Sequence, residues 1–176
     1  KIRGNVANRA GGGIEAVAGT TTNLTNVLLS MNNTGVAPDA VAAPGNGGGL
    51  HITGAGNATI TGGEVSDNVA ALEGGGLWNG SGTMTINGTL ITRNTARGAG
   101  ADDGGGGVFN NGGTVNVTGA TISNNLATGA AGSGGGLLSL TGPVTLTGTT
   151  VSFNSANRAG GGIEIIVGAL TLTNSN

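Results

Sequence analysis

Acidic side chains and one histidine are the residues of this chain that could do chemistry. The glutamates Glu15, Glu64, Glu73 and Glu164 are scattered along the sequence, and His51 is the only histidine. Acid–base or nucleophilic catalysis needs several such groups held within hydrogen-bond reach of one another. No spacing in the sequence brings a second titratable group to His51 or pairs the glutamates. We therefore expect no catalytic site, and we predict that the chain is not an enzyme.

Two adjacent aspartates, Asp102 and Asp103, lie in the glycine-rich stretch 98–107 and are candidates for calcium binding. Calcium takes about six to eight oxygen ligands, and two neighbouring carboxylates do not supply that number. The chain has no cysteine, which excludes a thiolate zinc site and a disulfide scaffold. We predict a solvated loop here, with no metal and no cofactor.

A glycine triplet followed by one bulky aliphatic residue occurs six times and indicates how these side chains are positioned. From the start of each of the first five triplets to a recurring asparagine, the count is 20 or 21 residues. A fixed spacing of this kind is typical of stacked coils, none of which buries its apolar face alone. The triplets begin at Gly11, Gly47, Gly74, Gly105, Gly134 and Gly160, and the asparagines are Asn32, Asn68, Asn94, Asn125 and Asn154.

Within each repeat, three short β-rich runs are separated by glycine or asparagine turns. The middle run alternates apolar and polar residues, so one face of it is buried and the other faces water. We expect the asparagines to form an internal ladder of side-chain amides where the backbone turns. Aligned across the repeats, the interior positions of the second and third runs form two aliphatic columns. The columns are Ile60, Ile86, Val117, Leu146 and Leu172, and Leu29, Val65, Ile91, Ile122 and Val151.

These columns predict a parallel β-helix of about six coils that spans residues 1–176 as one domain. The GGG-aliphatic turn, the T-x-aliphatic-T-G run and the S-x-N-x-A segments, such as Ser123–Ala127 and Ser152–Ala156, carry a family resemblance. The chain resembles the right-handed parallel β-helix repeats of bacterial surface proteins in the pectate-lyase-like superfamily, and it is similar to polymorphic outer-membrane and adhesin repeats. The resemblance implies right-handed coils and an extracellular or bacterial cell-surface location.

The repeats differ in length at one turn, between the asparagine and the next triplet. We therefore expect long loops at residues 33–46, 95–104 and 126–133, all on one edge of the stack. The octapeptide NRAGGGIE occurs both at 8–15 and at 157–164, so the sequence starts and stops in nearly the same phase. We predict a solenoid without a cap at either end. It is either a segment of a longer array or a unit that self-associates end to end into a filament.

Large apolar residues occupy consecutive outward positions in the first run of the repeat. In the six successive repeats this position is occupied by Glu15, His51, Trp78, Phe109, Leu138 and Glu164. An exposed apolar stripe marks a contact surface, so Trp78, Phe109 and Leu138 are candidates for packing on another solenoid or on a surface glycan. The alternative is that a loop of the same chain covers them.

The outward threonines of the middle run form two files that climb the stack. Their spacing is about 7 Å within a coil and about 4.8 Å between coils. These T-x-T rows resemble the arrays of ice-binding β-solenoids, although threonine is also favoured at any exposed strand position. The candidate ice-binding residues are Thr59, Thr61, Thr85, Thr118, Thr145, Thr147, Thr171 and Thr173.

Composition limits the partners that we expect. The net charge is −2 with only six basic residues, which argues against nucleic-acid binding. The sequence has no run of 18 apolar residues, so we predict no membrane span in it. The sequence is best interpreted as an extracellular structural or adhesive solenoid, a rigid stalk or a filament unit. Ice binding is the first alternative, and a non-catalytic segment of a carbohydrate-active β-helix protein is the second.

Overall fold

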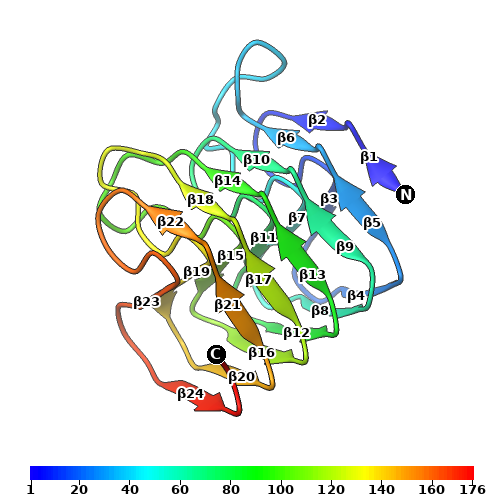
Figure 1. Ribbon diagram of the computed structural model, residues 1–176. Helices are drawn as coiled ribbons and strands as arrows, with labels where there is room; N and C mark the ends of the chain where they lie inside the picture. The colour runs from blue at the N-terminus through cyan, green and yellow to red at the C-terminus, as the bar shows by residue number, and fades with distance from the viewer.

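The computed structural model describes residues 1–176 and contains only β-strands, joined by turns and loops. Twenty-four strands form four parallel sheets of six strands each, which stack as a β-solenoid of about six turns (Figure 1). Each strand inside the stack pairs with the equivalent strand one coil before and one coil after it, as the columns of the sequence predict. We number the sheets in the order in which a coil visits them after its glycine triplet.

Sheet 1 contains β3 (Ile14–Ala16), β7 (Leu50–Ile52), β11 (Leu77–Asn79), β15 (Val108–Asn111), β19 (Leu137–Thr141) and β23 (Ile163–Ile165). Sheet 2 contains β4 (Thr21–Thr25), β8 (Asn57–Thr61), β12 (Thr83–Asn87), β16 (Thr114–Thr118), β20 (Val144–Thr147) and β24 (Leu170–Thr173). Sheet 3 contains β1 (Ile2–Arg3), β5 (Leu28–Ser30), β9 (Glu64–Ser66), β13 (Leu90–Thr92), β17 (Thr121–Ser123) and β21 (Thr150–Ser152). Sheet 4 contains β2 (Val6–Ala7), β6 (Asn33–Thr34), β10 (Val69–Ala70), β14 (Thr95–Ala96), β18 (Leu126–Ala127) and β22 (Ser155–Ala156).

The sequence indicates three β-rich runs in each repeat, whereas each complete coil of the structure has four strands; sheet 4 contains the additional one. Its strands have only two residues each and follow directly after the recurring asparagine. Two residues are too few to show an alternating pattern, so the strand is visible only through its pairing, such as Ala70 with Ala96 and Ala96 with Ala127. The alanines at these positions are buried because sheet 4 closes the fourth wall of the coil.

The hydrophobic core is a continuous stack of aliphatic side chains inside the coils. Nineteen buried residues form one cluster, which includes the predicted columns except for Val151, packed against it, and Leu172. The columns are in register: Ile60 pairs with Ile86, which pairs with Val117. Leu172 is 54% exposed because its coil has a neighbour on one side only.

The glycine triplet lets successive coils approach each other closely. A Cβ on Gly106 would lie 2.4 Å from the carbonyl oxygen of Leu126 and 2.5 Å from that of Gly135. Both contacts are far inside van der Waals distance, so only glycine fits without separating the coils. The first glycine of the same triplet, Gly105, has φ +62°, which other residues adopt at a cost.

The asparagine ladder lies on the inner side of the corner between sheets 3 and 4. The Nδ2 of each asparagine donates to the Oδ1 of the next, at 2.9 Å from Asn68 to Asn94 and 3.0 Å from Asn94 to Asn125. The same Oδ1 also accepts the backbone N–H of the preceding asparagine, as Asn94 does from Asn68. The ladder runs through Asn32, Asn68, Asn94, Asn125 and Asn154, and Asn5 adds a rung below Asn32.

The residue before each ladder asparagine turns the chain through a left-handed conformation. Its φ is +69° at Gly4 and lies between +54° and +57° at the five non-glycine positions, Met31, Asp67, Arg93, Asn124 and Phe153. We call this outward-facing row the left-handed corner. The length variation lies at the other end of sheet 4, as predicted. The longest of these loops, between β6 and β7, stands out from the stack in Figure 1.

Candidate functional site

The outer face of sheet 2 is a regular polar surface, which we call the threonine face. The pairing puts its side chains in two unbroken files of six, with no register shift between any pair of strands. One file is Asn23, Thr59, Thr85, Asn116, Thr145 and Thr171, and the other is Thr25, Thr61, Asn87, Thr118, Thr147 and Thr173. All eight candidate threonines of the sequence analysis therefore lie on one face.

The side chains of these two files are fully or half exposed, and none of them makes a hydrogen bond within the protein. Buried threonines at the end of the same sheet behave differently: Thr89 Oγ1 donates to the carbonyl of Gly62 at 3.1 Å, and Thr149 Oγ1 to that of Thr147 at 3.2 Å. The hydroxyls of the threonine face are thus held in a lattice by the backbone while their hydrogen-bonding capacity is directed to solvent.

The predicted exposed stripe of Trp78, Phe109 and Leu138 is wrong. Trp78 is only 7% exposed, and Phe109 and Leu138 are fully buried. They form a small second core on the outer side of sheet 1, with Leu140 packed against it. The His51 ring stacks on Trp78 with 4.2 Å between ring centroids, and the Trp78 ring lies parallel to Phe109 at 6.0 Å. The chain itself covers this file, which was the alternative, so these side chains offer no surface to a partner.

Loop length is the signal that could have predicted this burial. Long turns precede the coils of His51, Phe109 and Leu138, whereas six-residue intervals precede the coils of Glu15 and Glu164. Aromatic or apolar residues thus occupy this position after each long turn, and a charged residue occupies it after two of the three short turns. Trp78, whose own turn is short, lies between two covered neighbours in the register.

One carboxylate that the sequence analysis did not single out as part of a site, Glu73, lies against the buried file. Glu73 Oε2 accepts from Trp78 Nε1 at 2.9 Å and from Asn46 Nδ2 at 3.3 Å. Burial raises the pKa of Glu73 to about 7; the hydrogen bond from Trp78 opposes this rise and the charge of Asp103 adds to it. Burial, assisted by the charge of Arg9, lowers the pKa of His51 to about 4. At neutral pH the histidine is uncharged.

Removing the ionisable group of Glu73 is expected to change how stability depends on pH. Between about pH 4.5 and 7 the folded chain holds a proton on Glu73 that the unfolded chain has lost, so raising the pH favours unfolding. The Glu73→Gln variant keeps an oxygen acceptor for Trp78 and should gain about 1–3 kcal/mol relative to the wild type between pH 4 and pH 8. Urea unfolding followed by Trp78 fluorescence at a series of pH values measures this difference.

His51 also affects how stability depends on pH: its contribution rises with pH between about pH 4 and 6.5, opposite to that of Glu73. Because His51 is present in both the wild type and Glu73→Gln, the difference between the two stability curves reports on Glu73 alone. The Asp39→Asn variant, which removes a carboxylate from an exposed loop, serves as the control. Stability curves of the wild type and Glu73→Gln that stay parallel from pH 4 to 8 would contradict the assignment.

Ion pairs lie at both ends of the buried file. Arg9 pairs with Glu15, and Arg158 pairs with Glu164 at 3.0 Å, in the two copies of the octapeptide. The Arg158 guanidinium also donates to Ser133 Oγ at 2.9 Å and to the carbonyl of Ala101 at 2.6 Å. Oε2 of Glu164 is buried and has no hydrogen-bond partner.

The remaining acidic residues lie apart from one another. Glu64 and Asp67 contact Arg93 on the surface, and Asp103 accepts the backbone N–H of Gly100 at 2.7 Å, while Asp102 is exposed. No three histidine, cysteine or carboxylate side chains of residues 1–176 lie close enough together to hold a metal ion.

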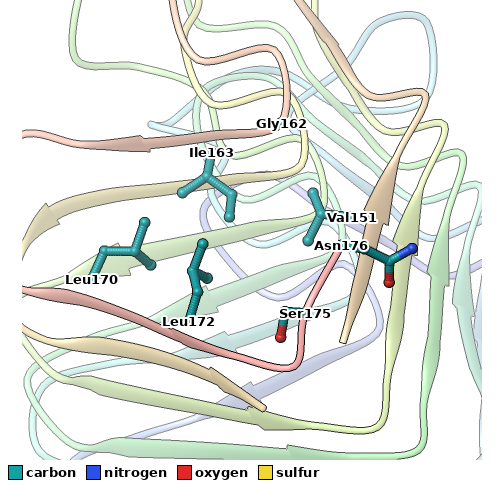
Figure 2. A pocket seen from close by; sticks show the side chains of 7 residues that line it. All are labelled: Val151, Gly162, Ile163, Leu170, Leu172, Ser175 and Asn176. Atoms are coloured by element: carbon teal, nitrogen blue, oxygen red, sulfur yellow. The ribbon is translucent and has the colours of Figure 1, made fainter. Parts of the chain in front are cut away.

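An apolar cavity of about 340 Å³ opens at the C-terminal end of the stack (Figure 2). Figure 2 shows Leu170 and Leu172 of β24 pointing toward Ile163 of β23 and Val151 of β21 around it. The cavity is the end of the core, where the aliphatic columns reach the last coil. Its lining is Val151, Gly162, Ile163, Leu170, Leu172, Ser175 and Asn176.

No protein-family model matches the sequence, and neither a curated protein nor a solved structure matches it. The structure contains no helix of the length and apolar character that a membrane crossing requires.

Proposed function

We propose that the chain is a structural element of the extracellular space or of the bacterial cell surface, where it acts as a rigid stalk, adhesin spacer or filament unit. The observation that carries the proposal is the unbroken parallel pairing of six strands in each of four sheets. Four hydrogen-bonded walls around a packed core resist bending, because bending would have to stretch one wall or compress the opposite one. The role is mechanical rather than catalytic.

Two features of the chain support this assignment. Its repeat resembles those of right-handed parallel β-helix proteins of bacterial surfaces, and we place it in the pectate-lyase-like superfamily on that resemblance. Its architecture also keeps the core constant while the loops after sheet 4 vary in length, as expected of a scaffold that presents loops on one edge.

The proposal is tested by locating the protein. Antibodies against the 176-residue chain should label intact cells of the organism that makes it as strongly as permeabilised cells, with an antibody against a cytoplasmic enzyme as the control. Labelling that requires permeabilisation would contradict the surface location.

Ice binding is the second candidate, and the threonine face favours it. Two files of six threonine or asparagine side chains with no internal hydrogen bonds leave a regular lattice of hydroxyls and methyls that water can occupy. Nine of the twelve side chains in the two files are threonines, and three of the six rows are T-x-T.

Substitution of Thr145 or Thr171 by tyrosine is expected to abolish thermal hysteresis and ice-crystal shaping, because one large ring interrupts the lattice. The matched control is Thr121→Tyr, which places the same ring on the outer side of sheet 3, away from the threonine face. The wild type showing no hysteresis at high protein concentration would exclude ice binding and leave the structural role untouched.

A further inference from the structure

We propose that Glu73 is a proton-operated latch at the edge of the buried file. In the closed state, protonated Glu73 holds the Trp78 ring and the corner at Asn46 together. Loss of the proton releases both contacts and admits water to the edge of the ring. The latch is a conformational device inside the stack, and it is independent of the structural role proposed above.

Three consecutive corners of the stack bring the groups of the latch together. The first N–H of a glycine triplet donates to the carbonyl of the residue before the next triplet, at 2.9 Å both for Glu73 and for Gly104. Asn46, Glu73 and Gly104 therefore occupy equivalent places in successive coils, and Asp103 comes one residue before the last of them. The position of Glu73 between Asn46 and this loop is thus determined by the backbone register.

Glu73 joins this column of corners to the Trp78 ring. Its Oε2 accepts from Trp78 Nε1 at 2.9 Å and from Asn46 Nδ2 at 3.3 Å. Trp78 is 7% exposed and Asn46 is 9% exposed, so both donors are nearly removed from solvent. An indole N–H can only donate, and Glu73 is its acceptor in this structure. When Glu73 moves away, water must reach the edge of the ring to replace the bond.

The surroundings of Glu73 disfavour a charge on it. Neither of its two donors is charged, and none of the ion pairs of the chain includes it. The charged group that acts on Glu73 is a second carboxylate, that of Asp103. Burial raises the pKa of Glu73 to about 7, against the hydrogen bond from Trp78 and with the help of Asp103. The closed site therefore favours the neutral acid, whereas water stabilises the ionised form.

His51 is the other titratable group in contact with the Trp78 ring. Its ring stacks on the face of Trp78 with 4.2 Å between centroids, whereas Glu73 contacts Nε1 at the edge. Burial, assisted by the charge of Arg9, lowers the pKa of His51 to about 4, and Arg9 itself is paired with Glu15. Of the two groups on the ring, only Glu73 changes charge between about pH 5.5 and 8.

Linkage gives the direction and the size of the effect. In the open state the pKa of Glu73 returns to its ordinary value of 4.5, whereas in the closed state it is about 7. Opening therefore becomes more favourable as the pH rises from about 4.5 to 7, and the effect levels off above that range. From pH 5.5 to pH 8 the ratio of open to closed molecules rises about 25-fold.

Hydrogen exchange of the Trp78 indole N–H tests the latch directly, since Nε1 is the atom that donates to Glu73. Trp78 is the only tryptophan, so its indole N–H gives a single NMR signal. The Glu73→Gln variant keeps an acceptor for Nε1 and stays uncharged. Dividing the wild-type exchange rate by that of the variant at each pH cancels the intrinsic pH dependence of exchange. We expect this ratio to rise about 25-fold from pH 5.5 to pH 8.

Two carboxylate variants form a matched pair of controls. Asp103→Asn removes the like charge that acts on Glu73, which lowers the pKa of the closed state and should make the rise smaller. Asp39→Asn removes a carboxylate from an exposed loop and should leave the rise unchanged. The backbone N–H of Ile86, in the core of the same coil as Trp78, should exchange more slowly than the indole at every pH, because only the edge of the ring opens.

A ratio of wild type to Glu73→Gln that stays constant from pH 5.5 to pH 8 would overturn the latch. An indole N–H that exchanges no faster than the backbone N–H of Ile86 would also overturn it, since the whole coil would then be opening. Equal rises in Asp103→Asn and Asp39→Asn would remove Asp103 from the device.

Discussion

The Asn94→Ala variant is expected to lose about 3–5 kcal/mol of its free energy of unfolding. Asn94 lies in the middle of the ladder, where its side chain makes four buried hydrogen bonds. Its Oδ1 accepts from the backbone N–H and the Nδ2 of Asn68, and its Nδ2 donates to the carbonyl of Val65 and to Oδ1 of Asn125. Alanine removes all four of these bonds in the interior and leaves the backbone N–H of Asn68 without its partner.

Denaturant unfolding followed by Trp78 fluorescence measures the effect, since Trp78 lies in the same coil as Asn94. Asn87→Ala is the matched control: Asn87 is also an asparagine in that coil, but its side chain faces solvent from the threonine face and makes no hydrogen bond. The control should change stability by less than about 0.5 kcal/mol. Equal losses in the two variants would mean that the ladder contributes nothing specific.

The Gly106→Ala variant is expected to lose at least about 3 kcal/mol, because the added methyl group has no space. Its Cβ would lie within 2.6 Å of the backbone of both the same coil, at Leu126, and the next coil, at Gly135. Backbone atoms cannot rotate away as a side chain does. The coils must therefore separate, and the hydrogen bonds between neighbouring triplets weaken with them.

Gly119→Ala separates this steric effect from backbone conformation. Gly119 has φ +60° but nothing within 4 Å of a Cβ placed on it. Alanine there should cost only about 1 kcal/mol, the penalty of a left-handed residue. Thermal unfolding followed by circular dichroism compares the two variants. A Gly119→Ala protein that is as unstable as Gly106→Ala would refute the argument that close packing of the coils requires the triplets.

The features that repeat in every coil could be predicted from the sequence. The aliphatic columns, the asparagine ladder, the position of the long loops and the alignment of the T-x-T rows all follow from one spacing that recurs five times. Each is local to a coil and its neighbours, so the period determines it. The fourth sheet was missed because two-residue strands such as Val69–Ala70 have no pattern of their own.

Features that differ between coils could not be predicted in the same way. Burial of Trp78, Phe109 and Leu138 depends on what covers the outer side of sheet 1, and no period in the sequence describes that cover. The raised pKa of Glu73 follows from the same cover, because the carboxylate shares the interior with the Trp78 ring. The charged residues Glu15 and Glu164 at the ends of the file, where turns are short, were the signal available in the sequence.

The left-handed corner has a consequence for how such a protein can diversify. Its five non-glycine residues, Met31, Asp67, Arg93, Asn124 and Phe153, share one backbone conformation but have five different chemistries. Phe153 is 84% exposed, and Arg93 contacts only other surface groups. Because the side chains here point away from the core, single substitutions can rewrite this edge at little further cost to folding. Substitutions can therefore change the surface chemistry of this edge while the packed interior stays the same.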